Sequence, residues 1–279
     1  MKDSPSMEQT LSRLDLTLLE RLLSGTIFCN NIVYQEITGS TNQVAKRLAE
    51  AGAVHGSLVI SEEQRAGRGR MGRKWLSAPY RNLLFSVLLR PRLYTKDSFL
   101  LTVSMAVSIF DAVLGITGRE ARIKWPNDIY MEGRKAGGIL TELSAQGRMV
   151  SWAVVGVGLN VNWTPGGEFA SISEIVGRSV NREPLLGEIL KRYDYYLEAI
   201  GTQKRGEILE RYESNSLLKG KEVLIQQGQG AEQGLIKGKA LGIDSEGALL
   251  VEDNSGQIHR VSFGDVSVVG WENNEEART

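Results

Sequence analysis

The hydrophobic pattern divides the chain into two parts. Up to about residue 216, apolar runs of strand length alternate with longer segments in which apolar residues recur every three or four positions. This mixture predicts a sheet covered by helices. After residue 216 only short apolar runs follow, and glycine-bearing turns separate most of them. Short strands at such spacing predict a small β-barrel.

The first part predicts both helices and strands. Helices are expected over residues 11–23, 42–50, 97–114 and 184–212, with Asp97 as a cap and Pro184 at a helix start. Strands are expected over residues 32–37, 57–61, 82–89, 121–125, 128–131 and 135–143, and a strand pair or one long strand over 149–162. The nearly unbroken apolar run at 82–89 predicts a centrally buried strand. Glu132-Gly133 predicts a hairpin turn.

The second part predicts five short strands, at residues 223–225, 234–240, 248–252, 257–261 and 266–269. We therefore expect an N-terminal helical extension (1–30), a larger α+β domain (31–216), a small β-barrel domain (217–271) and an acidic tail (272–279). The single helix of the extension is not a helix-turn-helix, which argues against a DNA-binding domain there.

Composition indicates a soluble, cytoplasmic protein. The 279 residues include 33 Lys or Arg and 33 Asp or Glu, and this neutral balance argues against bulk nucleic-acid binding. The single cysteine excludes an internal disulfide framework, and two histidines are too few for a zinc site. The N-terminus lacks the pattern of a secretory signal. The longest apolar stretch, residues 99–110, is predicted to be too short to span a membrane.

One segment departs from this balance. Residues 64–96 hold nine Lys or Arg and no Asp or Glu, and five of these cations lie within residues 65–74 among three glycines. Such a loop predicts a site for phosphate or carboxylate. Gly67, Gly69 and Gly72 also match the dinucleotide pattern G-x-G-x-x-G, but no helix opens at the third glycine and no acidic residue follows at the required distance. A solvated basic loop and a single-stranded nucleic-acid contact through Trp75 remain alternatives.

Three further motifs allow both a structural and a functional interpretation. Ser40 and Gln43 form a capping-box pattern, but short polar side chains at a helix start also suit a polar ligand head. Residues 124–128 (Lys-Trp-Pro-Asn-Asp) suit a turn, or a nucleotide phosphate with its magnesium. Glycines within the strands at 137–138 and 156–158 indicate close approach of another group.

Together these motifs resemble those of biotin–protein ligases in order and spacing. They are Gly39-Ser-Thr-Asn42, Gly67-Arg-Gly-Arg70 with Gly72-Arg-Lys-Trp75, Lys124-Trp-Pro-Asn-Asp128, Arg134-Lys135 with Gly138-Ile-Leu, and Gly156-Val-Gly-Leu-Asn160. The resemblance runs from about residue 32 to the C-terminus. It implies the α+β catalytic fold of biotin and lipoate ligases, a mixed or antiparallel sheet layered with helices as in class II synthetases, plus an SH3-like barrel. The chain resembles the form without an N-terminal DNA-binding domain, so no DNA binding is expected.

The resemblance also implies a reaction and its residues. Biotin would be activated by ATP and Mg²⁺ to biotinyl-5′-AMP and passed to a lysine of a biotin carboxyl carrier domain, by a monomer or homodimer away from any membrane. Arg68, Arg70 and Lys135 are expected to be catalytic. Biotin is expected to contact Ser40, Thr41, Asn42, Gln64, Gly67, Arg68, Gly69, Arg70, Lys135 and Gly138. ATP is expected to contact Trp75, Lys124, Asn127, Asp128 and Asn160, with Asp128 also binding Mg²⁺.

Two departures and three rival functions accompany this resemblance. Met71 stands where a bacterial relative has a basic residue, and residues 266–271 lack an arginine that some relatives present to the nucleotide. The oligomeric behaviour and a contact between the barrel and ATP are therefore not transferred. The rivals are a lipoate–protein ligase of the same fold, a non-enzymatic RNA-binding module, and an oxidoreductase that uses the glycine pattern. The loop also predicts that Arg70→Gly releases biotinyl-AMP.

Overall fold

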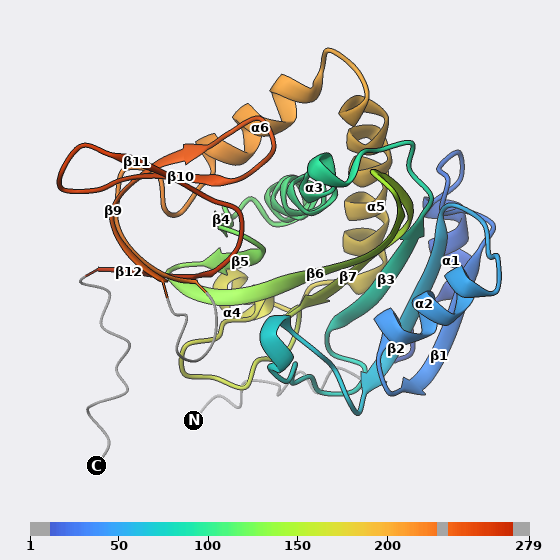
Figure 1. The fold of residues 1–279 in the computed structure, drawn as a ribbon. Coiled ribbons are helices and arrows are strands. Elements are labelled where there is room, and N and C mark those ends of the chain that lie inside the picture. The colour runs from blue at the N-terminus through green and yellow to red at the C-terminus, as the bar shows by residue number, and fades with distance from the viewer. Residues whose placement is uncertain (1–11, 228–233, 270–279) are drawn as a thin grey trace, which may run out of the picture.

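A seven-stranded mixed sheet forms the body of the molecule (Figure 1). The structure is a computed structural model that describes residues 12–227 and 234–269. The sheet has the order β1-β2-β3-β7-β6-β5-β4. Its strands are β1 Ile32–Thr38, β2 Ser57–Gln64, β3 Leu83–Leu89, β4 Arg122–Lys124, β5 Asp128–Met131, β6 Arg134–Gln146 and β7 Met149–Leu159. β1 and β2 are parallel and the other neighbours antiparallel. Every residue of β3 is buried, so the predicted central strand is confirmed.

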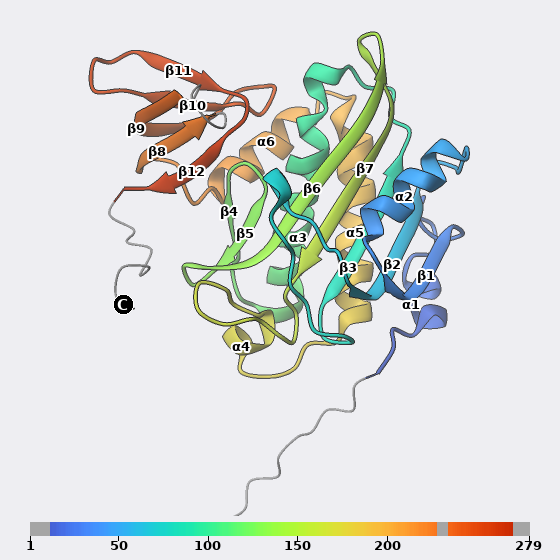
Figure 2. The same cartoon turned by 60° about the horizontal axis from the view of Figure 1, so that its bottom comes forward.

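Helices cover both faces of this sheet, which confirms the α+β class (Figure 2). The helices are α1 Leu16–Leu22, α2 Thr41–Glu50, α3 Phe99–Thr117, α4 Ile172–Val176, α5 Arg182–Ile200 and α6 Arg205–Ser214. On one face, alternate residues of β2, β3 and β7 belong to the same buried apolar cluster as α3 and α5, and α3 packs on β4, β5 and β6. On the other face, α2 buries Val44, Ala45 and Ala49 against the opposite set of residues in the same three strands. This alternation follows from the two-residue period of a strand.

The core helix α3 is longer than its sequence suggested. Residues Thr95–Thr117 are long and apolar enough, by length and composition, to cross a membrane, so the expectation that this stretch is too short was wrong. Of its most apolar window, however, 78% is buried inside the molecule, against α5, α6 and β6. The helix is hydrophobic on all sides because protein surrounds it on all sides.

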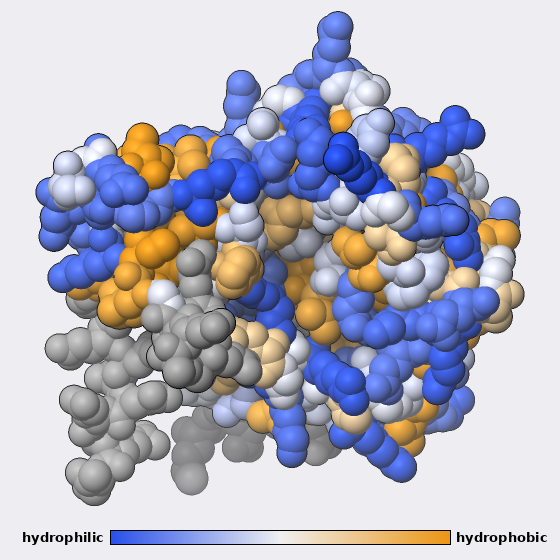
Figure 3. All heavy atoms as spheres, in the orientation of Figure 1, coloured by the Kyte–Doolittle hydropathy of each residue, from blue (hydrophilic) through white to orange (hydrophobic). Residues whose placement is uncertain are grey.

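The remaining described strands form a second, antiparallel sheet, here called the C-terminal domain. They are β8 Glu222–Gln227, β9 Gly234–Ile243, β10 Leu249–Glu252, β11 Ile258–Val261 and β12 Asp265–Val268, in the order β11-β10-β9-β8-β12. The indole Nε1 of Trp125 donates to the Gly247 carbonyl at 3.0 Å, and the Ile243 amide donates to Glu213 at 2.9 Å. These bonds tie the C-terminal domain to the turn after β4 and to α6. Apolar side chains gather on its surface (Figure 3) and include Leu235, Ile258, Phe263 and Val269.

Several predicted elements differ from the structure. Residues 184–212 form two helices, α5 and α6, because the chain turns between Gly201 and Lys204. Of the two alternatives for residues 149–162, the single long strand is observed, ending at Leu159, and the short helix α4 was not predicted. Asp97 does not cap α3, since Ser98 occupies the cap and buried Asp97 accepts a bond from Arg205 at 2.8 Å. The helix predicted over 11–23 is observed from Leu16, while Leu11 and the acidic tail lie outside the described residues.

A buried ion pair anchors the start of the described chain. The Glu62 carboxylate in β2 has no exposed side-chain surface and accepts from Arg182 of α5 at 2.5 Å. Glu62 also accepts from the Leu14 amide at 2.7 Å, and Arg182 donates to the Ser12 carbonyl at 2.7 Å. Because both charges use the backbone of residues 12–14 as partners, this N-terminal segment is part of the packed body rather than a loose tail.

Candidate active site

A cavity of about 510 Å³ opens between the basic loop, the sheet and the C-terminal domain. Its walls bring together segments that are far apart in sequence, and nearly all the residues singled out from the sequence lie in them. The predicted site residues in these walls are Ser40, Thr41, Asn42, Gln64, Arg68, Gly69, Arg70, Trp75, Lys124, Asn127, Asp128, Lys135 and Gly138. The sequence motifs, weak individually, thus converge on one site.

The polar end of the cavity lies at the N-terminus of α2. The Thr41 amide and hydroxyl both donate to Gln64 Oε1, at 2.8 and 3.2 Å. Ser86 of β3 donates to Asn42 Oδ1 at 2.7 Å. Ser40 makes no capping bond, so the capping-box interpretation is wrong for its side chain. A buried hydroxyl that is not used for capping remains available to a ligand.

Glycines of β6 and β7 allow two side chains to lie directly on the sheet. A Cβ at Gly158 would come within 2.3 Å of the Trp75 indole, and one at Gly138 within 3.4 Å. These two glycines face each other in the β6–β7 pairing. A Cβ at Gly156 would come within 1.8 Å of Asn42 Oδ1. The prediction of close approach at these glycines is confirmed, and the approaching groups are Trp75 and Asn42.

The basic loop folds into a small hairpin against the C-terminal domain. The Gly69 amide donates to the Arg73 carbonyl at 2.7 Å, and the Trp75 amide donates to the Gly67 carbonyl at 3.0 Å. Met71 at the tip has a φ of 54° and Gly72 a φ of 76°, so the turn uses the left-handed region twice. Gly67 itself is buried beneath Trp75 and does not line the cavity.

Two arginines of this loop reach the C-terminal domain. Arg70 donates to Asn127 Oδ1 at 3.3 Å and to the Gly264 carbonyl at 3.2 Å. Arg73 forms an ion pair with Asp265 of β12. Arg68 is exposed beside the cavity. The loop therefore has an ordered position that is held from a distant part of the chain.

A second cationic wall comes from β4–β6. Lys135 Nζ lies 2.8 Å from Asp128 Oδ1, and Lys124 Nζ lies 3.4 Å from the Tyr130 hydroxyl. Asn127 donates to the Ile139 carbonyl at 2.6 Å, which fixes its amide so that the oxygen faces Arg70. The two lysines thus come from β4 and β6, on either side of β5, and line the same cavity as the loop arginines.

Burial changes the electrostatics of these cations. It lowers the pKa of Lys124, an effect that Asp128 opposes and Lys135 reinforces. Burial likewise lowers the pKa of Arg70, with Asp128 opposing and Arg73 reinforcing the shift. Positive groups removed from water in this way gain more from a bound anion than solvated ones do. The cavity is therefore suited to a polyanionic ligand.

Asn160 does not belong to this cavity, contrary to the sequence expectation. Its side chain is buried and donates to the Ala170 carbonyl at 3.2 Å, while Asn82 donates to its oxygen at 3.4 Å. These bonds fasten the loop that follows β7 to β3. The motif position is thus occupied by a structural amide in this chain.

Several wall residues were not anticipated from the sequence. Tyr130, Glu168, Gln226 and Asp265 line the cavity, and Ser86 and Glu142 bond to its polar end. Gln226 and Asp265 come from the C-terminal domain and carry no local signal. Glu142 follows the Gly138-Ile-Leu motif on β6. Because side chains two residues apart lie on the same face of a strand, its position two residues after Leu140 was the one sequence clue that it lies near the site.

Carboxylates near the cavity are few and separate. The described residues contain no group of three or more His, Cys, Asp or Glu that could hold a metal ion by themselves. Asp128 is the carboxylate closest to the lysine wall, and Glu168 acts electrostatically on Lys124 from the loop after β7. Asp128 could therefore serve as one ligand of an ion whose other ligands come with the substrate.

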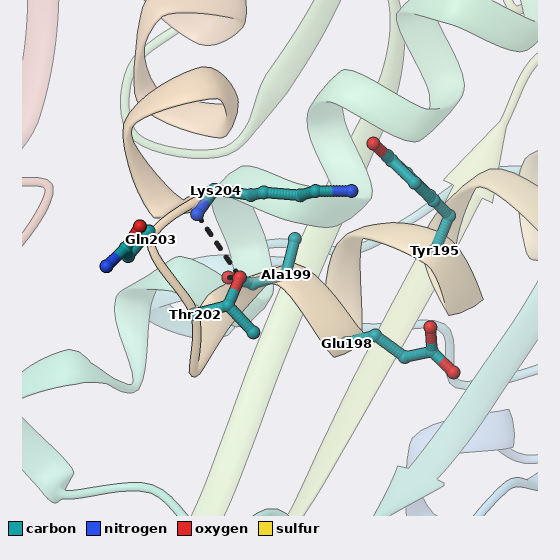
Figure 4. Close-up of a pocket in the computed structure, with 6 residues that line it drawn as sticks. All are labelled: Tyr195, Glu198, Ala199, Thr202, Gln203 and Lys204. Carbon is teal, nitrogen blue, oxygen red and sulfur yellow. Dashed lines mark hydrogen bonds between the residues drawn. The ribbon is translucent and has the colours of Figure 1, made fainter.

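A second hollow of about 430 Å³ lies at the end of α5 (Figure 4). There the Lys204 ammonium lies 5.5 Å from the centre of the Tyr195 ring. None of the residues singled out from the sequence lines this hollow.

The chain is similar to known proteins over most of its length. Residues 34–160 match the Biotin/lipoate A/B protein ligase family, and residues 220–269 match the Biotin protein ligase C terminal domain. The bifunctional ligase/repressor BirA of Bacillus subtilis is 33% identical over 258 residues, which are 88% of this chain and 76% of that protein. The biotin–[acetyl-CoA-carboxylase] ligase of Paracoccus denitrificans is 30% identical over 79% of this chain and 93% of its own.

A solved structure resembles the chain as a whole. The biotin protein ligase from Aquifex aeolicus, in complex with biotin and ATP, superposes with a TM-score of 0.73 at 31% identity. The match covers 86% of this chain and 98% of that one. The likeness therefore extends over both the body and the C-terminal domain.

Proposed function

The chain belongs to the biotin/lipoate A/B protein ligase family, and we propose that it is a biotin–protein ligase. It activates biotin with ATP to biotinyl-5′-AMP and transfers the biotinyl group to one lysine of a biotin carboxyl carrier protein. Relatives named as biotin–[acetyl-CoA-carboxylase] ligases and a relative bound to biotin and ATP support this proposal.

The observation that carries the proposal is the composition of the cavity beside the basic loop. One end offers the Ser40 hydroxyl and the Gln64 amide, and the other end offers Arg70, Lys124 and Lys135. The cyclic urea of biotin has one acceptor and two donors, so it matches a cluster of hydroxyl and amide groups. The cations match a carboxylate and a polyphosphate.

In the first step the biotin carboxylate attacks the α-phosphate of ATP. The new carboxyl–phosphate bond forms as the bond to pyrophosphate breaks. Both reactants are anions, so positive charge must lie between them, and we assign this role to Arg68, Arg70 and Lys135. Trp75, Lys124 and Asn127 are assigned to the nucleotide. No general base is required, since the attacking carboxylate is already ionised.

In the second step the neutral amine of the carrier lysine attacks the acyl carbon. The amide bond forms as AMP leaves, and the lysine nitrogen gives up a proton. The basic loop would cover the mixed anhydride until the carrier arrives, which limits its hydrolysis. The bonds from Arg70 to Asn127 and Gly264 support a position of the loop over the cavity.

Magnesium fits the site as a partner of the nucleotide rather than as a resident ion. We assign it to Asp128, with the remaining ligands supplied by phosphate oxygens and water, as is usual for Mg²⁺. When bound, it would neutralise negative charge on the phosphates. The Asp128–Lys135 ion pair holds the carboxylate in the cavity wall.

The rival functions are less well supported. A lipoate ligase shares the fold, but the dithiolane ring of lipoate has no hydrogen-bonding counterpart for the polar groups around Ser40 and Gln64. An RNA-binding module would not need a cavity with an apolar and glycine floor.

We retain the predicted division into an extension (1–30), a catalytic domain (31–216), a C-terminal domain (217–271) and a tail (272–279).

The test is acyl-adenylate formation. The protein is incubated with Mg²⁺, α-labelled ATP and either biotin or lipoate, and the products are separated. Biotin-dependent adenylate, followed by labelling of a biotin carboxyl carrier domain, is the expected result. Adenylate formed only with lipoate would assign the chain to the sister activity. The absence of both products from a folded sample would overturn the proposal.

A further inference from the structure

A chain of hydrogen bonds behind the polar end of the cavity fixes the orientation of Asn42. Its Nδ2 donates to the Leu140 carbonyl at 3.1 Å and to Glu142 Oε2 at 2.9 Å. A backbone carbonyl and an ionised carboxylate can only accept hydrogen bonds. The NH₂ group must therefore face β6 and Oδ1 must face Ser86, in a residue that lines the cavity.

Glu142 is itself held from the other side. Its Oε1 accepts from Lys46 Nζ at 2.9 Å. Lys46 lies four residues after Asn42 on α2, so both side chains project from the same face of the helix toward β6. Burial raises the pKa of Glu142, but the bonds from Lys46 and Asn42 and the charges of Lys46 and Arg68 outweigh it and keep the pKa below its usual value. The carboxylate is therefore ionised at neutral pH.

The result is a defined pattern of donors and acceptors at the cavity surface. Asn42 Oδ1 sits over Gly156, where any side chain would collide with it. The Ser86 hydroxyl lies 2.7 Å from both Asn42 Oδ1 and Thr41 Oγ1, and it donates its one hydrogen to one of these two acceptors. The backbone amide of Thr41 orients Gln64 in the same way, so Gln64 Nε2 is directed away from Thr41. A cyclic urea requires such a pattern, acceptors for its N–H groups and donors for its oxygen.

We infer that Glu142 is a positioning residue for biotin recognition, which acts by fixing the Asn42 amide with its oxygen toward the ligand. Glu142 does not line the cavity, and its side chain on β6 is 35% exposed. It acts through Asn42, and Lys46 keeps the carboxylate in place. This inference rests on the proposed function, because it concerns how the ureido group is recognised.

Substitution of Glu142 by glutamine separates positioning from simple packing. Glutamine has the same shape but only one acceptor oxygen. The Lys46 ammonium can only donate and carries a charge, so it takes that oxygen. The new NH₂ group then faces the NH₂ group of Asn42, and one donor loses its partner. Removal of Lys46 would free the glutamine oxygen to turn back to Asn42.

The experiment measures biotin affinity by calorimetric titration of the full chain without ATP. Glu142→Gln is expected to weaken biotin binding about 10- to 100-fold, the usual consequence of an unsatisfied donor. Lys46→Met is expected to weaken it by no more than about threefold, since Glu142 still accepts from Asn42. The double variant Lys46→Met/Glu142→Gln is expected to bind biotin more tightly than Glu142→Gln alone. Glu188→Gln, in a comparably exposed ion pair with Arg192, is the matched control.

The outcomes are distinct. If Glu142→Gln binds biotin within about twofold of the parent, the inference is overturned. It is also overturned if the double variant binds biotin as weakly as Glu142→Gln. The effects of two independent structural defects on affinity would add, whereas a restored hydrogen bond to Asn42 would recover affinity. If Glu142→Gln does not fold, the double variant and Lys46→Met must bind biotin within about threefold of each other, and a larger gap is contrary to the inference. A parent protein that binds no biotin would overturn both the inference and the proposed function. A parent that binds while Glu142→Gln is unaffected overturns only the inference.

Discussion

Gly158→Ala should separate nucleotide binding from biotin binding. The Trp75 indole rests on Gly158, and a Cβ there would lie 2.3 Å from the ring, whereas ordinary contacts begin at 3.4 Å. The ring must therefore retreat by about 1 Å from the sheet. Stacking of a base on an aromatic ring contributes about 1–3 kcal/mol. Loss of that stacking should weaken binding of the nucleotide about 10- to 100-fold.

The assay compares two ligands on the same protein. Calorimetric titration with a non-hydrolysable ATP analogue and, separately, with biotin should show a large loss for the first and no more than about a threefold loss for the second. Gly206→Ala is the control, because a Cβ at Gly206 meets nothing within 4 Å. Unchanged affinity for the nucleotide would refute the assignment of Trp75 to the adenine. Equal losses for both ligands would instead indicate a shift of the whole strand β7.

Three further predictions concern the loop, the anchor and the lysine wall. Arg70→Gly should release biotinyl-AMP and label lysines of a non-carrier protein, since the loop loses its bonds to Asn127 and Gly264; retention of the adenylate on a desalting column as in the parent would contradict this. Arg182→Leu should lower the free energy of unfolding by about 3–5 kcal/mol, because Glu62 is left as an uncompensated buried charge. Urea denaturation measures this loss, and Glu62→Gln in the same chain should recover part of it, so an additive loss would be contrary to the reasoning. Affinity for ATP should fall as pH rises through the lowered pKa of Lys124, below 10.5, since only the ammonium form attracts phosphate; Lys124→Arg should remove this dependence, and a fall that persists in Lys124→Arg would assign it to another group.

The sequence predicted those features whose cause is local. The apolar run of β3 and the glycines of β6 and β7 have meaning within a few residues, because burial and close approach leave their mark at the position itself. The reading of residues 184–212 as one helix failed because helical periodicity continues through both helices. Gly201, at the C-cap of α5, was the available sign of a break.

Features that depend on distant contacts could not be predicted. The ion pair between Arg73 and Asp265 joins segments almost two hundred residues apart, and no local pattern marks Asp265 as the partner of the basic loop. Glu142 reaches Asn42 only through the packing of α2 on β6. Asn160 looked like a ligand group because its motif did, although its surroundings made it a buried structural amide. The residue assignments themselves stay predictions until the variants are measured.

The Lys124–Asp128 segment also has a consequence for genetic screens. Lys124, Trp125 and Asn127 all line the cavity, but Trp125 is almost fully buried and its indole donates a hydrogen bond to the Gly247 carbonyl of the C-terminal domain. Neighbouring codons thus encode residues proposed to bind the nucleotide and a residue that attaches the C-terminal domain. A loss-of-function allele at Trp125 would be scored with the active-site alleles, yet its defect would be one of assembly and should respond to growth temperature. Alleles at Lys124 should fail at every temperature.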